Sequence, residues 1–355
     1  MSDNLLTGDG PVGGVPDPVA AARVALLEMI NGYWVSQIVR AAADLRLADH
    51  LADGVRTAAE VAERESSDPA TTYRLMRACA AIGLLSLDQG GRFSVTSLGG
   101  LLRSGVPGSM RDSALAFTAP GHWLPWGRLP DAVRQGGTQA RAVLGADAFE
   151  YLAGQPAEER WFAAAMASVT SAMAAQAARV IDTGGVSLAV DIGGGTGELV
   201  RALMHANLAL RGHVTDLPQV VDAALRAAEA EGLGDRFTAA AGDFFTEVPG
   251  ADLYLLRSVL HDWDDESCVR ILRNCRAAAQ PGARLLVLEN VIGEPGRDRF
   301  AALLDMNMLA VTGGQERHLT GYDSLAAASG WTRTEVLALP GSRSILEYRP
   351  ADAVS

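Results

Sequence analysis

Lysine is absent from this sequence. All 30 basic residues are arginine, against 42 acidic residues, for a formal net charge of −12. This charge repels nucleic acid and anionic membranes unless the arginines are segregated. The sequence also lacks a run of about 18 apolar residues, which argues against a membrane span. Its first residues have neither a basic start nor an apolar run, so no secretory signal is expected. We predict a cytoplasmic protein that binds neither nucleic acid nor membrane.

Cysteine is scarce as well. Cys79, Cys268 and Cys275 form neither a disulfide framework nor a metal-binding knuckle, so we expect reduced thiols and no metal site. The chain of 355 residues is 48% hydrophobic, which suffices for a large core in one or two domains.

The first part of the chain is expected to be helical. Residues 1–16 contain Gly and Pro with little periodicity, which predicts a disordered leader. Asp17 and Pro18 then supply an N-cap and a first helical residue. Apolar residues recur at helical spacing from Val24 to Val39, which predicts one long helix with an apolar stripe. That stripe is larger than a solitary surface helix needs.

A winged helix is predicted next. Residues 57–60 fit a capping box, residues 68–69 begin a second helix, and residues 83–95 have the pattern of a β-hairpin. Such a module serves in packing and dimerisation or in DNA binding. Within residues 57–103, five acidic residues balance five arginines, which disfavours a phosphate-binding surface. We therefore assign residues 17–110 to an N-terminal dimerisation domain, with DNA binding as the alternative.

The remainder of the chain predicts an α/β fold. Residues 111–180 have a helical pattern that we expect to break at Pro120, Pro125 and Pro130 and at the glycine pair 136–137. Strand-like runs then alternate with amphipathic helices over residues 181–355, which predicts a doubly wound, Rossmann-like parallel sheet. The last two strand-like runs have no clear helix between them, so we expect an antiparallel pair at one edge.

A glycine-rich loop follows the first strand of this sheet, in the run VDIGGGTGEL. Gly193 and Gly195 let the backbone turn tightly and let a ligand approach it closely. The spacing is G-x-G-x-G, whereas dinucleotide sites use G-x-G-x-x-G, and Glu198 would repel a pyrophosphate at the helix N-terminus. The loop therefore favours a cofactor without phosphates. A nicotinamide dehydrogenase and a glycine turn without ligand are the alternatives.

The ends of the next strands also carry residues suited to a nucleoside. Asp216 ends the second strand, where a carboxylate can accept both ribose hydroxyls or cap the following helix. Asp243 and Phe244 follow the third strand and suit an adenine amino group and ring face. Open α/β sheets bind ligands at this edge, so the coincidence of these positions predicts one cofactor site.

The runs VDIGGGTGEL, GDFF, VLHDWDD and GGQER occur in this order after the winged helix. Over roughly residues 20–350 the sequence resembles the plant-type small-molecule O-methyltransferases and their bacterial relatives, which act on phenazines, aromatic polyketides and similar secondary metabolites. The resemblance implies S-adenosylmethionine as cofactor, a hydroxyl on an aromatic small molecule as acceptor, and a homodimer formed by the N-terminal region. The cofactor residues that we assign are Asp191, Gly193, Gly195, Asp216, Leu217, Gly242, Asp243, Phe244, Arg257 and Ser258. Plant members usually have lysine at the position of Arg257, so its charge is kept with a different geometry.

By the same resemblance, His261 matches the general base of the family, and the reaction needs no metal. A sulfonium is already a good leaving group, so the enzyme must align the attack and remove a hydroxyl proton. The pKa of histidine near neutrality suits that task. Glu289 and Glu316 match the two acids that flank the histidine, hold it in one tautomer and stabilise its charged form. Without the flanking motifs, His261 would be interpreted as a structural or surface residue, and for Glu289 and Glu316 an ordinary strand-end or loop acid would be an equal alternative.

Residues that line the acceptor pocket in relatives are the least specific part of the resemblance. They match Trp123, Met166, Asp262, Trp263, Asn307 and Met308. Core packing is the alternative for Met166 and Trp123, and residues 120–150 match only loosely, so the acceptor is not identified. A winged-helix regulator with a small-molecule-binding α/β domain, and a family member diverted to non-methylating chemistry, are the alternative functions.

Overall fold

A computed structural model describes residues 17–54, 56–293, 298–340 and 343–351. The chain divides into two compact parts, an N-terminal unit of residues 1–102 and a C-terminal unit of residues 103–355. The predicted leader lies outside the described residues. No helix in the described ranges has the length and apolar character needed to cross a membrane.

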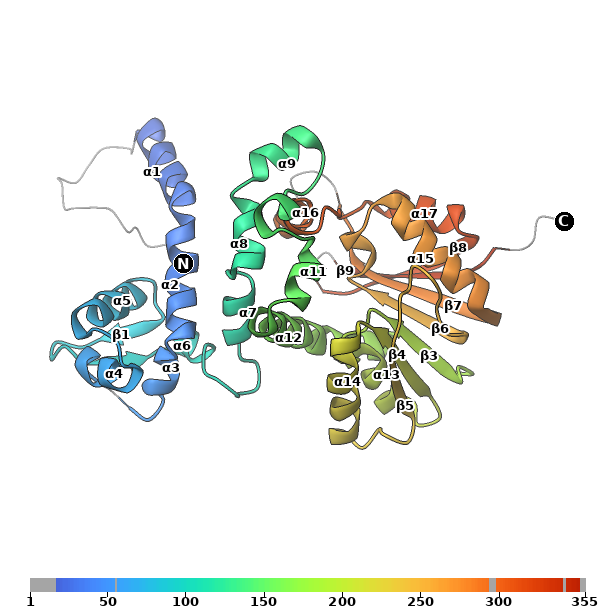
Figure 1. The fold of residues 1–355 in the computed structure, drawn as a ribbon, viewed down its shortest axis with the longest axis horizontal. Coiled ribbons are helices and arrows are strands. Elements are labelled where there is room, and N and C mark those ends of the chain that lie inside the picture. The colour runs from blue at the N-terminus through green and yellow to red at the C-terminus, as the bar shows by residue number, and fades with distance from the viewer. Residues whose placement is uncertain (1–16, 55, 294–297, 341–342, 352–355) are drawn as a thin grey trace. The chain divides into compact units, whose positions relative to one another are not determined.

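The N-terminal unit contains six helices in its described part and one small hairpin (Figure 1). Their bounds are α1 Pro18–Ile30, α2 Gly32–Asp44, α3 Leu47–His50, α4 Ala58–Glu65, α5 Pro69–Ala81, β1 Leu85–Leu87, β2 Phe93–Val95 and α6 Ser97–Gly100. Helix α4 begins with the predicted capping box, in which Thr57 and Glu60 bond each other's backbone N–H groups. Helix α5 begins with the predicted N-cap Asp68. Strands β1 and β2 pair antiparallel, which completes the predicted winged helix.

The prediction of one long helix from Val24 to Val39 was wrong. Asn31 ends α1 and precedes α2 with φ −88° and ψ 2°, which is not helical geometry. Asn and Gly are poor helix formers in the middle of a helix, and Asn31 is followed by Gly32. Helix α1 has no buried residue within this chain, and its Met29 and Ile30 are 75% and 60% exposed. The apolar stripe is therefore real, but two helices carry it.

The C-terminal unit contains a seven-stranded sheet in the order β5-β4-β3-β6-β7-β9-β8. The strands are β3 Leu188–Ile192, β4 Arg211–Asp216, β5 Phe237–Ala241, β6 Ala251–Arg257, β7 Ala279–Asn290, β8 Trp331–Ala338 and β9 Arg343–Pro350. Strands β3 to β7 are parallel, whereas β9 pairs antiparallel with both β7 and β8. This confirms the predicted Rossmann-like sheet with an antiparallel pair at one edge.

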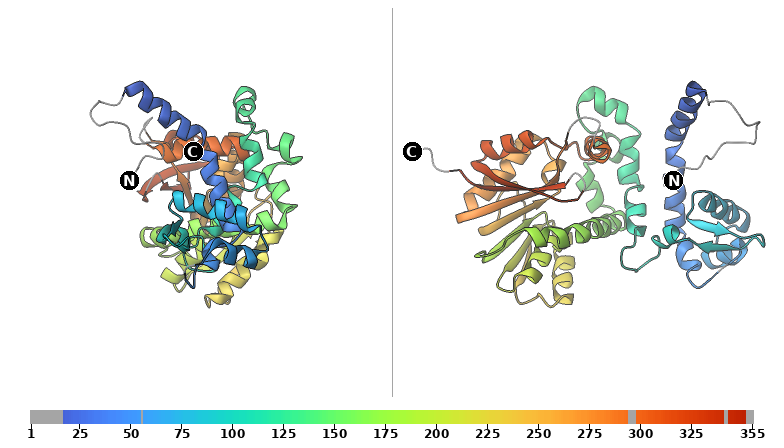
Figure 2. Two further views of the ribbon diagram at one scale, coloured as in Figure 1. Left: turned by 90° about the vertical axis from the view of Figure 1, so that its left-hand side faces the viewer. Right: turned by 180° about the vertical axis from the view of Figure 1, so that it is seen from behind.

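Helices cover both faces of the sheet (Figures 1 and 2). Alternate residues of β6 point to opposite faces, so Leu253 and Leu255 pack in one core layer while Tyr254 and Leu256 pack in the other. The first layer contains residues of α12, α13 and α14, and the second contains residues of α15 and α17. The helix bounds are α12 Pro156–Val180, α13 Glu198–Ala206, α14 Pro218–Ala230, α15 Asp265–Ala278, α16 Arg299–Val311 and α17 Leu319–Ala328.

Residues 111–180, at the start of the C-terminal unit, are largely helical, as expected. Its shorter helices are α7 Arg111–Ala116, α8 Pro120–Trp126, α9 Leu129–Gln135, α10 Ala140–Leu144 and α11 Ala148–Ala153. Pro120 and Pro130 lie in the first turns of α8 and α9, where proline is tolerated. The expected break at Pro125 was wrong, because this buried proline lies inside α8, one residue before its end. There its ring removes only one hydrogen bond of a helix that is already terminating.

Candidate functional site

The cofactor residues predicted from the sequence meet at the carboxyl ends of the parallel strands. The parallel registers align Ile192 of β3 with Thr215 of β4 and with Leu256 of β6, so these strands end side by side. The glycine-rich loop, the turn after β4, and the loop after β6 therefore start from neighbouring positions. All of them belong to the C-terminal unit.

The glycine-rich loop wraps around a buried carboxylate. Gly193 and Gly195 have φ of +63° and +60°, a left-handed conformation that side chains disfavour. A Cβ on Gly194 would lie 2.6 Å from Cγ of Asp191. A residue with a side chain at position 194 could therefore not approach this carboxyl as closely as glycine does. The loop is thus shaped by Asp191 as well as by the turn itself.

Asp191 has the features of a ligand-binding carboxyl. It is 2% exposed, and its buried Oδ1 has no hydrogen-bond partner among the described residues. Burial raises its pKa to about 7, although the positive charge of Arg257 opposes this shift. Burial lowers the pKa of Arg257, which interacts in turn with Asp191 and Glu289. An unpartnered buried oxygen is costly unless a ligand or water satisfies it.

Asp216 joins two loops at the end of β4. Its Oδ2 accepts the Gly195 N–H at 2.7 Å, and its Oδ1 accepts the Leu217 N–H at 2.7 Å. The N-cap position of α14 is Leu217, so Asp216 does not cap that helix in the way considered from the sequence. Each carboxylate oxygen can accept a second hydrogen bond, so both remain able to bind hydroxyl groups.

The loop after β5 presents an acid and an aromatic cluster. A Cβ on Gly242 would lie 2.6 Å from Cγ2 of Thr215, so the backbone passes close to β4 here. Asp243 accepts hydrogen bonds from the Phe245 N–H and from the Thr246 hydroxyl, each at 2.9 Å. The Phe244 ring lies 6.2 Å from that of Trp263, and a Cβ on Gly193 would lie 3.7 Å from Phe244. The aromatic cluster thus adjoins the glycine-rich loop.

The histidine loop begins with an unusual backbone conformation. Ser258, directly after β6, has φ +51°, and its N–H donates to the Leu288 carbonyl at 3.1 Å. Left-handed conformations outside glycine are concentrated at functional sites. The turn leads into a short 3₁₀ helix, η1 Leu260–Asp262, which carries His261.

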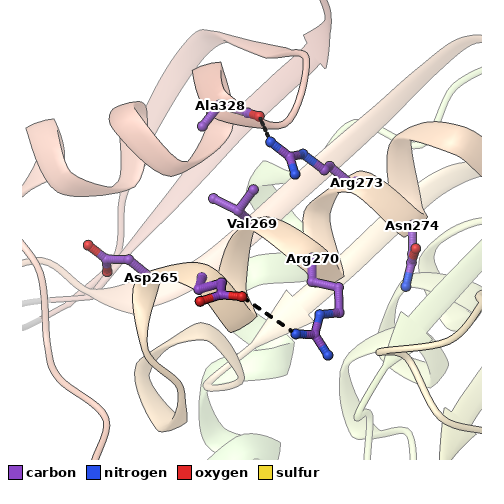
Figure 3. Close-up of a pocket in the computed structure, with 7 residues that line it drawn as sticks. Asp265, Val269, Arg270, Arg273, Asn274 and Ala328 are labelled. Atoms are coloured by element: carbon purple, nitrogen blue, oxygen red, sulfur yellow. Dashed lines mark hydrogen bonds and ion pairs between the residues drawn. The ribbon is translucent and has the colours of Figure 1, made fainter.

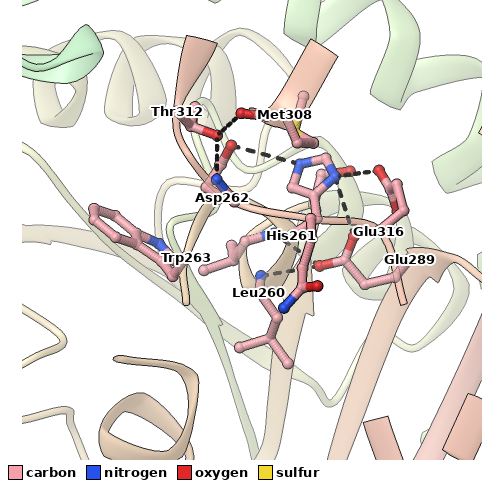
Figure 4. Close-up of polar contacts among 12 residues, drawn as sticks. Leu260, His261, Asp262, Trp263, Glu289, Met308, Thr312 and Glu316 are labelled. Atoms are coloured by element: carbon pink, nitrogen blue, oxygen red, sulfur yellow. Dashed lines mark hydrogen bonds and ion pairs between the residues drawn. The ribbon is translucent and has the colours of Figure 1, made fainter. Parts of the chain in front are cut away.

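His261 faces a group of buried acids (Figure 4). Its Nδ1 lies 2.7 Å from Glu316 Oε1 and 3.6 Å from Glu289 Oε2, while its Nε2 lies 3.9 Å from Asp262 Oδ1. His261 is 8% exposed, Glu289 1% and Glu316 3%. The fold therefore brings together the three residues that the sequence assigned to catalysis.

The acids fix both the position and the charge of the imidazole. Burial alone would lower the pKa of His261, but Glu289, Asp262 and Glu316 outweigh it and raise the pKa to about 10. Burial raises the pKa of Glu289 to about 7 and that of Asp262 to about 6, against the effect of His261. A proton on Nδ1 bonds to Glu316, so the neutral ring has its lone pair on Nε2.

The sequence showed no cluster with metal-ligand spacing, but the fold assembles one from distant segments. One atom each of His261, Glu289 and Glu316 could serve as a ligand, and these atoms lie within 4.8 Å of one another. The 2.7 Å separation of Nδ1 and Glu316 is a hydrogen bond, occupied by a proton. We therefore interpret the cluster as an acid–base group rather than as a ligand set.

Backbone contacts hold the histidine loop in place. Glu289 Oε1 accepts the N–H groups of Val259 and Leu260, each at 3.0 Å. A Cβ on Gly314 would lie 1.9 Å from the His261 carbonyl oxygen, so only glycine permits this approach. Arg317, which is 5% exposed, donates to the carbonyls of Leu260 and Trp263.

Sequence reasoning missed two of these supports. Arg317 was visible as the last residue of GGQER, but nothing in the sequence indicated which carbonyls it binds. Asp305 of α16 accepts the Glu316 N–H at 2.9 Å, and its position carried no local signal.

Some predicted acceptor residues lie beside this cluster. Met308 of α16 is near Asp262 in Figure 4, and it is buried. Asn307, also on α16, accepts a hydrogen bond at 3.0 Å from the Trp126 indole of α8. Trp263 stacks on Phe149 of α11 with ring centroids 5.8 Å apart. The aromatic residues Trp126 and Phe149 were missed, although both belong to the loosely matching stretch.

Trp123 and Met166 are less clearly connected to the site. Trp123 is on α8 and is 37% exposed, whereas Met166 is half-buried on α12. Neither is among the residues labelled around His261 in Figure 4. Core packing therefore still competes with acceptor binding for both.

A separate hollow of about 520 Å³ lies on α15 (Figure 3). Its lining includes Arg270, Arg273 and Asn274, on the opposite face of the helix from the buried Cys268 and Cys275. Arg273 already donates to the Ala328 carbonyl at 3.1 Å. No residue assigned to the cofactor, the acceptor or catalysis lines this hollow.

Comparisons with known proteins agree on one family. A model of the O-methyltransferase domain matches residues 126–332, and a model of the O-methyltransferase dimerisation domain matches residues 27–104. The chain is 37% identical to a phenazine O-methyltransferase of Lysobacter antibioticus, over 92% of this chain and 95% of that protein. The crystal structure of LaPhzM is 36% identical, with a TM-score of 0.89 over 94% of this chain and all of that one. An O-methyltransferase from neocarzinostatin biosynthesis, solved with S-adenosylmethionine and 2-hydroxy-5-methyl naphthoic acid, is 33% identical, with a TM-score of 0.77 over 89% of this chain and 96% of that one.

The acid cluster generates a prediction about protonation. Replacing Glu289 or Glu316 by Gln should lower the pKa of His261 from about 10 toward the ordinary 6.5, because each change removes a negative charge that stabilises the imidazolium. NMR titration of ring-labelled histidines measures this pKa, with the His261 signal assigned by its loss in His261→Gln. Glu231→Gln is the matched control, since Glu231 pairs with the exposed His205 at 2.9 Å. A native His261 that titrates near 6.5 would contradict the prediction.

Proposed function

The chain belongs to the S-adenosylmethionine-dependent O-methyltransferases, which act on aromatic metabolites, and from this premise we propose that His261 removes the proton of the hydroxyl that is methylated. The acceptor in this proposal is an aromatic secondary metabolite. The observation that carries the proposal is the 2.7 Å hydrogen bond between His261 Nδ1 and Glu316, which directs the lone pair of the neutral ring to Nε2. That nitrogen is the atom that takes the proton.

The residues at the carboxyl ends of the parallel strands fit S-adenosylmethionine. When bound, the cofactor supplies a methyl group on a positively charged sulfur, which is a good leaving group. Asp191 offers an unpartnered buried oxygen, and Asp216 keeps accepting capacity for ribose hydroxyls. Phe244 offers a ring for the adenine, and Asp243 a carboxylate for its amino group. The remaining assigned positions, including Arg257 and Ser258, lie at the same carboxyl ends of the strands.

The raised pKa of His261 suits a phenolic acceptor. An ordinary phenol has a pKa of about 10, so an imidazole of pKa near 6.5 would take its proton uphill. With a pKa of about 10, His261 matches the phenol, so proton transfer to the neutral ring is close to balanced; below pH 10 the neutral ring is the minor form, and activity is expected to rise with pH. Glu316 and Glu289 stabilise the imidazolium that forms. Aromatic side chains and Met308 beside Asp262 would hold the flat acceptor against this group.

The alternative functions receive less support. Family membership argues against a nicotinamide dehydrogenase and against a DNA-binding regulator. A family member diverted from methyl transfer would have no need of the His261–Glu316 pair, which is intact here.

We also propose that the N-terminal unit forms a homodimer. Its α1 and α2 expose Met29, Ile30 and Trp34, and a dimerisation model covers residues 27–104. A second copy of the same apolar face would bury them, as closed symmetric dimers do.

The dimer is tested by light scattering at micromolar concentration. Ile30→Asp should convert a dimer mass to a monomer mass, because it places a charge in the apolar interface. Val133→Asp is the matched control: Val133 is also 60% exposed, but it is on α9 of the C-terminal unit. A monomer mass for active, unsubstituted protein would rule the homodimer out.

The role of His261 is tested by kinetics. His261→Ala should lower the rate of methyl transfer by roughly 10² to 10⁴ and leave cofactor affinity nearly unchanged. Activity should rise with pH through a limb that the variant lacks, because only the neutral ring accepts a proton. His205→Ala, which removes another histidine paired with a glutamate, should change neither quantity.

The acidity of the acceptor distinguishes two explanations of a small loss of methyl-transfer rate in His261→Ala. A phenol beside a carbonyl ionises without help, so dependence on His261 should grow as the acceptor becomes less acidic. A negligible loss with every acceptor, including the least acidic, would make His261 structural.

The cofactor site is tested at Asp216. Asp216→Ala should weaken S-adenosylmethionine binding by an order of magnitude or more, because charge-assisted bonds to the ribose are lost. Calorimetry measures the affinity, and Asp222→Ala, at an exposed acid of α14, serves as the control. Unchanged binding in Asp216→Ala would mean that the ribose binds elsewhere.

A further inference from the structure

Cys268 of α15 is a buried thiol that the proposed mechanism does not use. The residue is 0% exposed, and its Sγ donates to the Leu260 carbonyl at 3.1 Å, with the Trp263 carbonyl 3.6 Å away. Cys79 and Cys275 are equally buried, but neither thiol makes a hydrogen bond within the described part of the chain. Burial raises the pKa of the Cys268 thiol to about 12, so it keeps the proton that it donates. Of the three thiols, the one that is bonded contacts the histidine loop.

The same two carbonyls accept hydrogen bonds from Arg317. Its Nη1 donates to the Leu260 carbonyl at 2.9 Å, and its Nη2 donates to the Trp263 carbonyl at 2.8 Å. Asp265 holds the guanidinium, because its Oδ1 accepts from Nε at 2.9 Å and from Nη2 at 2.7 Å. A carbonyl oxygen has two lone pairs, so both acceptor positions of Leu260 are occupied when Arg317 and Cys268 donate together.

The two donors come from separate elements. Helix α15 begins at the N-cap Asp264, whose carboxylate accepts the Ser267 N–H at 2.8 Å, and Cys268 is the next residue after Ser267. Arg317 belongs to the loop before α17. A helix therefore sets the position of the thiol, and a different segment sets that of the guanidinium.

The short helix η1 depends on such outside contacts. It spans only Leu260–Asp262, and 3₁₀ turns have poorer hydrogen-bond geometry than α-helices. His261 is its middle residue, and the imidazole Nδ1 has to stay 2.7 Å from Glu316 Oε1. A small displacement of η1 would lengthen that bond.

We propose that Cys268 is a positioning residue for His261: its thiol and Arg317 together hold η1 so that the imidazole stays against Glu316. The thiol acts through the backbone of η1 and keeps its proton throughout. The inference rests on the function proposed for His261, which it extends to a side chain outside the acid–base group.

Loss of the thiol should loosen η1 without unfolding the enzyme, because Arg317 still bonds both carbonyls. The charged groups that act on His261 are Glu289, Asp262 and Glu316, and none of them is changed by a substitution of Cys268. Their combined effect raises the pKa of His261, so an imidazole held less firmly beside Glu316 should have a lower pKa.

Infrared spectroscopy of the full-length enzyme without substrate tests the hydrogen bond itself. The S–H stretching band of a thiol moves to lower wavenumber when the thiol donates a hydrogen bond. Cys268→Ala should remove the shifted component of this band. Cys275→Ala is the matched control, since Cys275 is in the same helix and the same core layer, and it should remove an unshifted component.

Kinetics and NMR titration test the effect on His261. With a hydroxyphenazine as acceptor probe, Cys268→Ala should lower kcat roughly three- to tenfold, as expected for one lost hydrogen bond, and leave the KM for S-adenosylmethionine unchanged. The pKa of His261 should fall by about half a unit. Cys275→Ala should change none of these quantities. Cys268→Ser, which keeps a donor, should recover most of kcat.

Four results would overturn the proposal. They are a shifted S–H component that survives Cys268→Ala, equal losses of kcat in the two alanine variants, a kcat of Cys268→Ser no higher than that of Cys268→Ala, and an unmoved His261 pKa in Cys268→Ala. If His261→Ala keeps full activity, the proposed general base is wrong. A lost S–H component and a lowered His261 pKa in Cys268→Ala would then still show that the thiol positions His261.

Discussion

The hydrogen bond between His261 and Glu316 is the interaction on which the rest of the site depends. Bringing three carboxyl groups into a buried place is unfavourable unless a positive charge accompanies them. The imidazole is that charge: the acids raise its pKa to about 10, and its charge in turn opposes the burial that raises the pKa of Glu289. Removing His261 would leave Glu316 buried without its charged partner, and removing Glu316 would leave His261 only its longer contacts with Glu289 and Asp262. The loop, the helix ends and the strand ends around this pair are arranged to keep the partners in contact.

The fold maintains this contact mostly through its backbone. Glu289 is fixed by its place in β7, between strands on either side, and it binds the two N–H groups that open the histidine loop. Gly314 lets the following loop touch the His261 carbonyl, and Arg317 holds the carbonyls on either side of His261. Side chains held by strands and backbone bonds vary little in position, which a proton transfer requires.

How much of this could be predicted depended on whether the signal was local. The caps at Thr57 and Asp68 and the strand ends with Asp191 and Asp216 follow from neighbouring residues, and the sequence located them. The break at Asn31 was hidden, because apolar residues on both sides continue the same helical period. Pro125 was misjudged because its effect depends on how soon the helix ends.

The remaining features arise only when distant segments meet. Phe149 stacks on Trp263, and Asp305 accepts the Glu316 N–H, across separations that no spacing rule describes. Nothing in the sequence singled out Tyr322 of α17. Only the fold reveals that its hydroxyl is buried, with no hydrogen-bond partner among the described residues.

The elevated basicity of His261 also bears on which acceptors suit the enzyme. A hydroxyl must lose its proton for its oxygen to become a strong nucleophile, so a base matched to phenol lowers the barrier. An aromatic amine attacks through a lone pair that it already has, and it releases its proton only after the new bond has formed. A base of ordinary pKa would serve that second order of events equally well. In the proposed mechanism, the cluster of Glu289, Glu316 and Asp262 therefore assists hydroxyl acceptors most, with its largest effect on those whose protons are held most tightly.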